Sequence, residues 1–226
     1  MGLIIFTVIF GAIILVCIIR VIIWILQAQK KRREAMAQIA HKLDLNYLEE
    51  YSEYKDTEYN SFKLFNEGHS RKAYNVIGGK KENCAVDIFD YVYVTGAGKN
   101  RQTHYYSVCI LIIPQRFKSL YIRRENFFDK IAGVIGFDDI DFESKEFSSK
   151  YYVKSDDKKF AYDIIHPQMM EFLLRTPQVP FIEINSRHLA FYIGGKIKPE
   201  TYIGLYDFAS KFYGKTPDYV LDECKV

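Results

Sequence analysis

The sequence predicts an α+β protein with a single N-terminal transmembrane helix, then an antiparallel β-meander packed with helices, and finally a C-terminal hairpin plus helix. Three observations support this prediction. A long apolar run opens the chain of 226 residues. Three segments rich in Val, Ile, Tyr and Phe then follow one another, separated by glycine-containing turns. The helical patterns come mostly after these strands, which argues against regular β–α–β alternation.

The apolar run extends from Leu3 to Leu26, with Arg20 as its one charge and no proline. A helix of this length reaches about 36 Å, whereas the hydrocarbon core of a bilayer is about 30 Å thick. A buried core helix is seldom so long or so uniformly apolar, so we expect residues 1–29 to form a transmembrane anchor. Arg20 is expected to snorkel to the nearer interface, where Trp24 also fits. A functional intramembrane charge is the alternative for Arg20, although the run holds no acidic partner.

Four consecutive cations follow the apolar run: Lys30, Lys31, Arg32 and Arg33. The two residues before the run carry no side-chain charge, so the positive-inside rule predicts a single-pass protein of the cell membrane with its N-terminus outside and its C-terminal domain in the cytosol. A cleaved signal peptide would carry its basic residues before a shorter apolar core.

The charge count assigns the excess of basic residues to this flank. Five of the 31 basic residues precede Glu34, the first acidic residue, so the remainder holds 26 basic and 28 acidic residues, a net charge of −2. The lipid bilayer is therefore the expected partner of the flank, and nucleic-acid binding is not supported.

Residues 30–46 are expected to join the basic cluster to an amphipathic helix that continues from the membrane. Apolar side chains recur there at a spacing of three and four residues, which places them on one stripe: Met36, Ile39, Ala40 and Leu43. The cytosolic α+β domain then occupies residues 47–226.

The first half of this domain is predicted to be mainly a meander. A short helix and a loop are expected within 47–71. Strands are expected at 72–77, 84–95, 103–113 and 120–123, with turns at 78–83 and 96–101. A helix is expected at about 126–134.

The second half is predicted to be mainly helical. The helical pattern from Asp157 to Arg175 is divided at His166–Pro167, because proline disfavours helical geometry in the preceding residue. A hairpin is expected from 180–185 and 188–193, turning at Ser186–Arg187. Pro199 opens a last helix that runs to about Tyr213, with an inward face made of Tyr202, Leu205, Tyr206, Ala209 and Phe212.

One pair of residues invites a catalytic interpretation. Asp90 and His104 lie on adjacent predicted strands, and a His–carboxylate pair is a candidate acid/base centre. An ordinary cross-strand contact is the alternative, because no recognisable Ser or Cys nucleophile accompanies the pair.

Other segments that suggest chemistry have structural explanations. The stretch 95–100 departs from a phosphate-binding loop, with Tyr93 in place of the first glycine and Asn100 in place of Ser or Thr. The four cysteines form no CxxC pair and indicate reduced thiols without zinc. The acidic clusters 138–141 and 156–157 lack calcium-loop spacing. We therefore expect no cofactor and no metal.

Several short motifs resemble those of a known group of proteins. They are Glu146–Phe147, Tyr152–Val153, Asp156–Asp157, Ala161–Tyr162, Pro167 with Met170 and Leu173–Leu174, and Phe89–Asp90–Tyr91 with Thr95–Gly96 and Gly98–Lys99. Over about residues 85–195 the chain resembles a widespread uncharacterised bacterial family with one or two N-terminal membrane helices and a cytosolic α+β domain. The resemblance implies this architecture and carries over no activity or catalytic residues.

Three hypotheses of function follow. The favoured one is a membrane-tethered, non-enzymatic interaction or scaffolding domain, whose partner is another membrane or cytosolic protein. The second is a membrane-proximal enzyme with a site near Asp90 and His104. The third is a lipid-surface-binding module that uses the basic cluster 30–33 and the helix after it.

Overall fold

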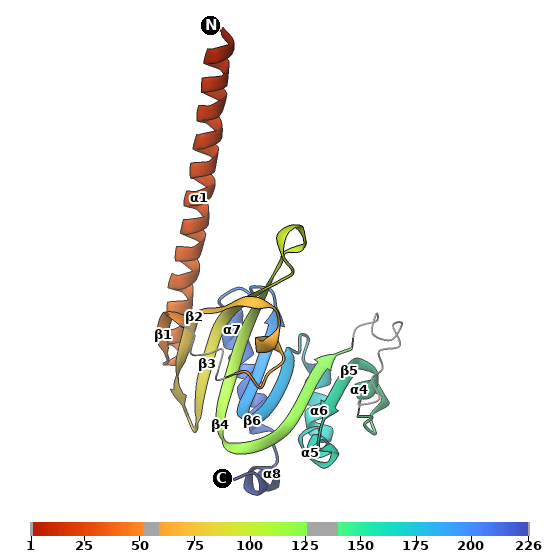
Figure 1. Cartoon of the computed structure of the whole chain (residues 1–226). Coiled ribbons are helices and arrows are strands. Elements are labelled where there is room, and N and C mark those ends of the chain that lie inside the picture. Colours follow the sequence, from red (N-terminus) through yellow and green to blue (C-terminus); the bar gives the residue numbers. More distant parts are fainter. Residues whose placement is uncertain (1, 52–58, 126–139, 226) are drawn as a thin grey trace.

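The structure, a computed structural model, describes residues 2–51, 59–125 and 140–225. Its first element is α1 (Gly2–Leu43), one continuous helix that projects far beyond the rest of the chain (Figure 1). The large apolar side chains described between Phe6 and Leu26 are all exposed. Within the described residues, α1 is the one helix long and apolar enough to cross a membrane.

The C-terminal part of α1 belongs to the folded domain. Met36, Ile39, Ala40 and Leu43 are buried there against the sheet and α7, which confirms the predicted amphipathic stripe. The helix passes the expected boundary at residues 29–30 without interruption. The apolar segment and the domain therefore share one element.

The sheet is antiparallel and follows the chain order, as the predicted meander requires. Its strands are β1 (Asn46–Tyr51), β2 (His69–Lys81), β3 (Cys84–Thr95), β4 (Gln102–Arg124), β5 (Tyr151–Ser155) and β6 (Phe181–Gly194). The spatial order is β1-β2-β3-β4-β5, and β6 also pairs with β4. The predicted α+β class is confirmed.

Two predictions about strands are wrong for the same reason. The separate strand at 120–123 is the end of β4, and the hairpin at 180–193 is one strand, β6. Ser186 has a φ of +52° and pairs with Phe117, where the β4–β6 register shifts on both sides. The two polar residues that suggested a turn thus form an irregularity at which two long paired strands bend together.

The start of the domain also differs from the prediction. β1 lies where a short helix was expected, and the helical structure described in that stretch is the 3₁₀ turn η1 (Leu64–Asn66). Residues 78–81, predicted as a turn, extend β2, so the β2–β3 turn contains only Glu82 and Asn83. The helix predicted at 126–134 lies outside the described residues.

The remaining helices are short apart from α7 (Thr201–Gly214), which has the predicted inward face. The break at His166–Pro167 separates α5 (Lys158–Ile164) from α6 (Pro167–Arg175), as predicted. The other elements are η2 (Gly98–Asn100), α4 (Lys145–Lys150) and α8 (Asp218–Glu223).

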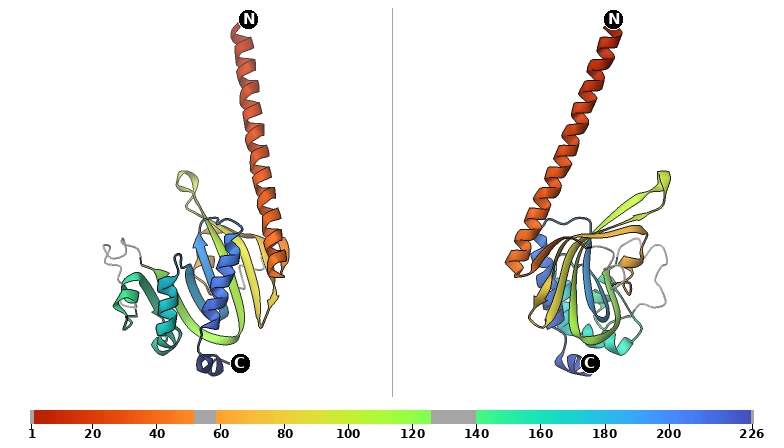
Figure 2. Two further views of the ribbon diagram at one scale, coloured as in Figure 1. Left: turned by 180° about the vertical axis from the view of Figure 1, so that it is seen from behind. Right: turned by 60° about the vertical axis from the view of Figure 1, so that its left-hand side comes forward.

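The two faces of the sheet are covered differently. α1 and α7 lie on one face, where they form the main core with residues such as Ile88 and Cys109 (Figure 2). The other face is aromatic, and the segment 59–65 covers it through Tyr59, Phe62 and Phe65. Alternate residues of β3 therefore point into different cores.

Candidate functional site

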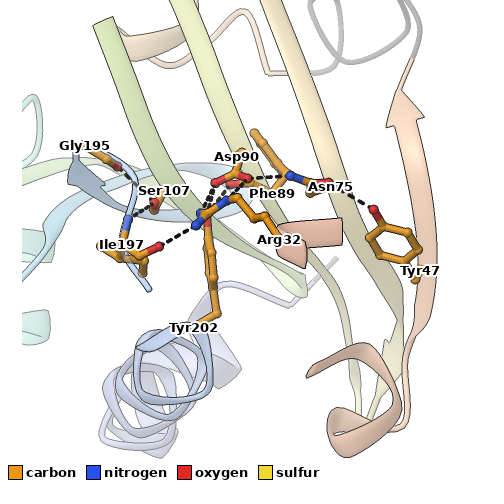
Figure 3. Close-up of polar contacts among 9 residues, drawn as sticks. All are labelled: Arg32, Tyr47, Asn75, Phe89, Asp90, Ser107, Gly195, Ile197 and Tyr202. Atoms are coloured by element: carbon orange, nitrogen blue, oxygen red, sulfur yellow. Dashed lines mark hydrogen bonds and ion pairs between the residues drawn. The ribbon is translucent and has the colours of Figure 1, made fainter. Parts of the chain in front are cut away.

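A fully buried carboxylate lies where α1 meets the sheet. Asp90 on β3 accepts two hydrogen bonds from Arg32 of α1, one from Nε to Oδ2 at 2.8 Å and one from Nη2 to Oδ1 at 2.6 Å (Figure 3). The third guanidinium nitrogen, Nη1, donates to the carbonyl oxygen of Ile197 at 2.9 Å. The Arg32 side chain is 18% exposed, so this bidentate ion pair is largely shielded from water.

Two neutral side chains complete the surroundings of this carboxylate. Asn75 Nδ2 donates to Asp90 Oδ2 at 2.8 Å, and the Tyr202 hydroxyl of α7 donates to Oδ1 at 2.9 Å. Asn75 reaches this position from the β2–β3 register shift between Tyr74 and Ile77, where its φ is +53°. Asparagine tolerates that left-handed conformation better than most residues.

The same contacts extend to β1, to β4 and to the loop after β6. The Tyr47 hydroxyl donates to Asn75 Oδ1 at 3.0 Å. Ser107, opposite Asp90 on β4, donates to the Gly195 carbonyl at 3.0 Å and accepts from the Ile197 amide at 3.1 Å. We call the following set the Asp90 network: Arg32, Tyr47, Asn75, Asp90, Ser107, Gly195, Ile197 and Tyr202.

The Asp90 network has the properties of a structural clasp. Burial and the negative charge of Asp90 raise the pKa of Tyr202 well above its ordinary value, so this hydroxyl stays protonated as a donor. Asp90 itself is enclosed by four donated hydrogen bonds and has no exposed surface for a substrate to reach. The network thus joins α1 to four strands, a loop and α7.

The predicted pairing of Asp90 with His104 is not found. Asp90 lies opposite Ser107, whereas His104 lies opposite Tyr93, three residues further along β3. An odd separation along a strand places two side chains on opposite faces of the sheet. His104 Nε2 instead lies 2.7 Å from Thr95 Oγ1, and its ring stacks on Tyr93 with a centroid distance of 4.8 Å.

The predicted membrane flank divides into exposed and inward-facing residues. Arg20, Trp24, Lys30 and Lys31 are exposed, and Lys30 lies 3.9 Å from the carboxylate of Glu34. Arg33 is partly buried. Arg32 turns into the domain toward Asp90, a role that sequence reasoning missed, because no local pattern links residues 58 positions apart.

A basic pocket opens beside the Asp90 network. Its volume is about 340 Å³, and it is lined by Gln29, Arg32, Arg33, Lys72, Tyr74, Asn75, Val92, Tyr105 and Lys196. The lining contains four cationic side chains and, among the described residues, no acidic one. We call this cavity the juxtamembrane pocket.

The described residues offer no other obvious reactive centre. In residues 2–51, 59–125 and 140–225, no three His, Cys, Asp or Glu side chains are grouped as metal ligands. Burial raises the pKa of the enclosed Cys109 thiol, which disfavours the nucleophilic thiolate. Cys109 therefore adds no chemical function to the site.

Comparison with known proteins gives a likeness of fold. No family model and no curated protein matches the chain. A solved structure, the crystal structure of the mycobacterial trehalose monomycolate transport factor A (TtfA), is similar with a TM-score of 0.55 and 13% sequence identity. The match covers 81% of this chain and 92% of that chain. At this identity, the chain shares its fold with that transport factor.

Proposed function

We propose that this protein is a membrane-tethered, non-enzymatic accessory protein, whose cytosolic domain is held in a fixed position beside a partner in the same membrane. The observation that carries the proposal is the continuity of α1, which runs from an exposed apolar segment into the core and is fastened there by Arg32. A tether of this kind sets both the distance and the orientation of the domain.

The apolar half of α1 requires a cover that the domain does not provide. None of its most apolar stretch is buried within the chain, and Trp24 is 69% exposed. A bilayer is the environment in which such a surface is stable, because the helix satisfies its own backbone hydrogen bonds. The cations at 30–33 support a cytosolic domain.

The shape of the domain supports the same placement. The β3–β4 hairpin tip lies on the side from which α1 leaves, whereas the C-terminus lies on the opposite side (Figures 1 and 2). Lys99 and Arg101 are exposed at this tip. The side that faces the membrane in this proposal therefore carries additional positive charge.

A non-enzymatic role is supported by the use the fold makes of its polar residues. Asp90 is enclosed in the clasp, and His104 lies on the other face of the sheet. The structural neighbour is named as a transport factor, and we propose an accessory role of that general kind for this chain.

The test compares rigid and flexible tethers in native membranes. A six-residue Gly/Ser linker inserted between Ala28 and Gln29 interrupts α1 before the clasp and leaves every residue of the domain unchanged. We expect cross-linking of the wild-type chain to capture a defined membrane protein, and the linker variant to lose this capture while its near-ultraviolet circular dichroism remains unchanged.

Two results would contradict the proposal. One is equal capture by both chains, which would show that fixed placement has no role. The other is substrate turnover by the purified full-length chain that Asp90→Asn or His104→Ala abolishes without unfolding it, which would favour the membrane-proximal enzyme.

A further inference from the structure

One edge of the juxtamembrane pocket lies at the depth of lipid headgroups if α1 spans a bilayer. Gln29, the first residue of its lining, follows Leu26, the last residue of the apolar run, by three positions, or about 4.5 Å along a helix axis. The polar region of each leaflet is about 5–7 Å thick, from the difference between the total and hydrocarbon thicknesses. The edge of the pocket at Gln29 therefore lies within the headgroup layer.

The wall of the pocket is built from elements that the fold brings together. Lys72 of β2, Val92 of β3 and Tyr105 of β4 form a row across three paired strands. Helix α1 forms another side of the pocket with Gln29, Arg32 and Arg33, which share one face of the helix because Arg32 and Arg33 follow Gln29 by three and four positions. The loop after β6 adds Lys196.

Lys196 is held over two aromatic rings. Its Nζ lies 4.2 Å from the ring centroid of Tyr105 and 5.4 Å from that of Tyr74, and no carboxylate of the described residues forms an ion pair with it. Burial lowers the pKa of Lys196, the charge of Asp90 opposes this effect, and the smaller effect of Arg32 adds to it. A bound anion would favour the charged form of this partly buried lysine.

The pocket lining also contains an unused hydrogen-bond donor. The Tyr74 hydroxyl is buried and has no hydrogen-bond partner among the described residues. Burial, followed by the charge of Asp90, raises the pKa of Tyr74, so the hydroxyl remains protonated. Buried hydroxyls are normally paired, and an anionic oxygen is a suitable acceptor.

From these observations we infer that the juxtamembrane pocket binds the phosphate group of an anionic lipid headgroup between Lys72, Lys196 and Tyr74. Arg32 remains engaged with Asp90, so a bound headgroup would lie directly against the clasp that holds α1. The inference rests on the proposed membrane tether, but its test uses detergent-solubilised protein. Failure of the pocket would therefore leave the tether unaffected.

The experiment titrates the full-length chain in detergent micelles by calorimetry. The probes are dioctanoyl phosphatidylglycerol, the zwitterionic dioctanoyl phosphatidylcholine, and glycerol 3-phosphate as a soluble phosphate. The pocket variant is Lys72→Gln with Lys196→Gln. The matched control is Lys63→Gln with Lys154→Gln, which removes the same charge from another pocket, of about 460 Å³.

We expect saturable binding of the phosphatidylglycerol, with weaker binding of the phosphatidylcholine. The pocket variant should bind the phosphatidylglycerol about thirtyfold more weakly, which corresponds to about 2 kcal/mol for the loss of two cations. The control variant should bind it with the affinity of the wild type. If glycerol 3-phosphate binds with an affinity comparable to that of the phosphatidylglycerol, the site is supported and a soluble phosphate is its ligand. If glycerol 3-phosphate does not bind while the phosphatidylglycerol does, the lipid headgroup is supported as the ligand. Equal affinity of the wild type and the pocket variant, equal loss in the control, or no preference between the two lipids would overturn the inference.

Discussion

At the scale of single residues, the Arg32–Asp90 pair combines a high desolvation cost with four well-aligned hydrogen bonds to the carboxylate. Such a pair contributes little net stability relative to an apolar replacement. Loss of one partner is far more damaging, because the other charge remains enclosed without compensation. The pair therefore specifies the position of α1 more than it adds to the total stability.

This asymmetry predicts a non-additive mutant cycle. Arg32→Met leaves the Asp90 carboxylate buried without its counter-ion and should lower the free energy of unfolding by about 3–5 kcal/mol. Arg32→Met combined with Asp90→Asn should recover part of that loss, because the buried charge is gone. Urea unfolding of the full-length chain in detergent measures the free energy of unfolding of both variants, with the near-ultraviolet circular dichroism of the tyrosines as the signal.

The control for this cycle is Glu171→Gln, which breaks an exposed ion pair with Arg175. Exposed pairs of this kind contribute little, so its unfolding curve should match the wild type. A double variant as unstable as the sum of its single variants would show that the two side chains act independently.

At the scale of elements, α1 has two environments along one helix. Its N-terminal part is apolar on every side, whereas its C-terminal part buries a single stripe against the sheet and α7. The stripe holds α1 to the domain along several turns and so fixes the direction of the helix axis. The Asp90 network alone would fix the helix at one point.

Met36→Ala tests this connection. Met36 is fully buried, so truncation should lower the free energy of unfolding by about 2–5 kcal/mol. The exposed Gln38, two residues away on the same helix, provides the control as Gln38→Ala, which should leave stability nearly unchanged. If Met36→Ala unfolds at the wild-type urea concentration, the stripe does not hold α1 to the domain.

At the scale of the whole molecule, the distribution of charge and apolar surface predicts the topology. We expect the full-length chain to stay in the membrane pellet after alkaline carbonate extraction. Ile13→Asp with Val16→Asp should release it, since each charge near the centre of the span costs about 2.5–3.5 kcal/mol. Both positions are exposed in the apolar part of α1, so we expect the domain to keep its fold.

A C-terminal epitope measures the orientation in the same preparation. It should resist protease added to intact cells and become sensitive after permeabilisation. Recovery of the unsubstituted chain in the soluble fraction would contradict the tether, and cleavage of the epitope in intact cells would contradict the cytosolic location of the domain.

Elements with a local signal could be predicted from the sequence alone. The apolar run, the stripe of α1, the full extent of β3, the break before Pro167 and the inward face of α7 all follow from periodicity or from the geometry of one residue. Such patterns arise because each residue's environment repeats along the element that carries it.

Features that depend on a distant partner became visible only in the folded chain. The local sequence at Ser186–Arg187 predicts a turn, but pairing with β4 keeps β6 continuous there. Adjacent strands suggest a pair of Asp90 and His104, but the β3–β4 register places the two side chains on opposite faces. Arg32 looked like any other cation of the flank. Its contact with Asp90 spans 58 positions and arises from the docking of a helix onto a sheet, which no local pattern encodes.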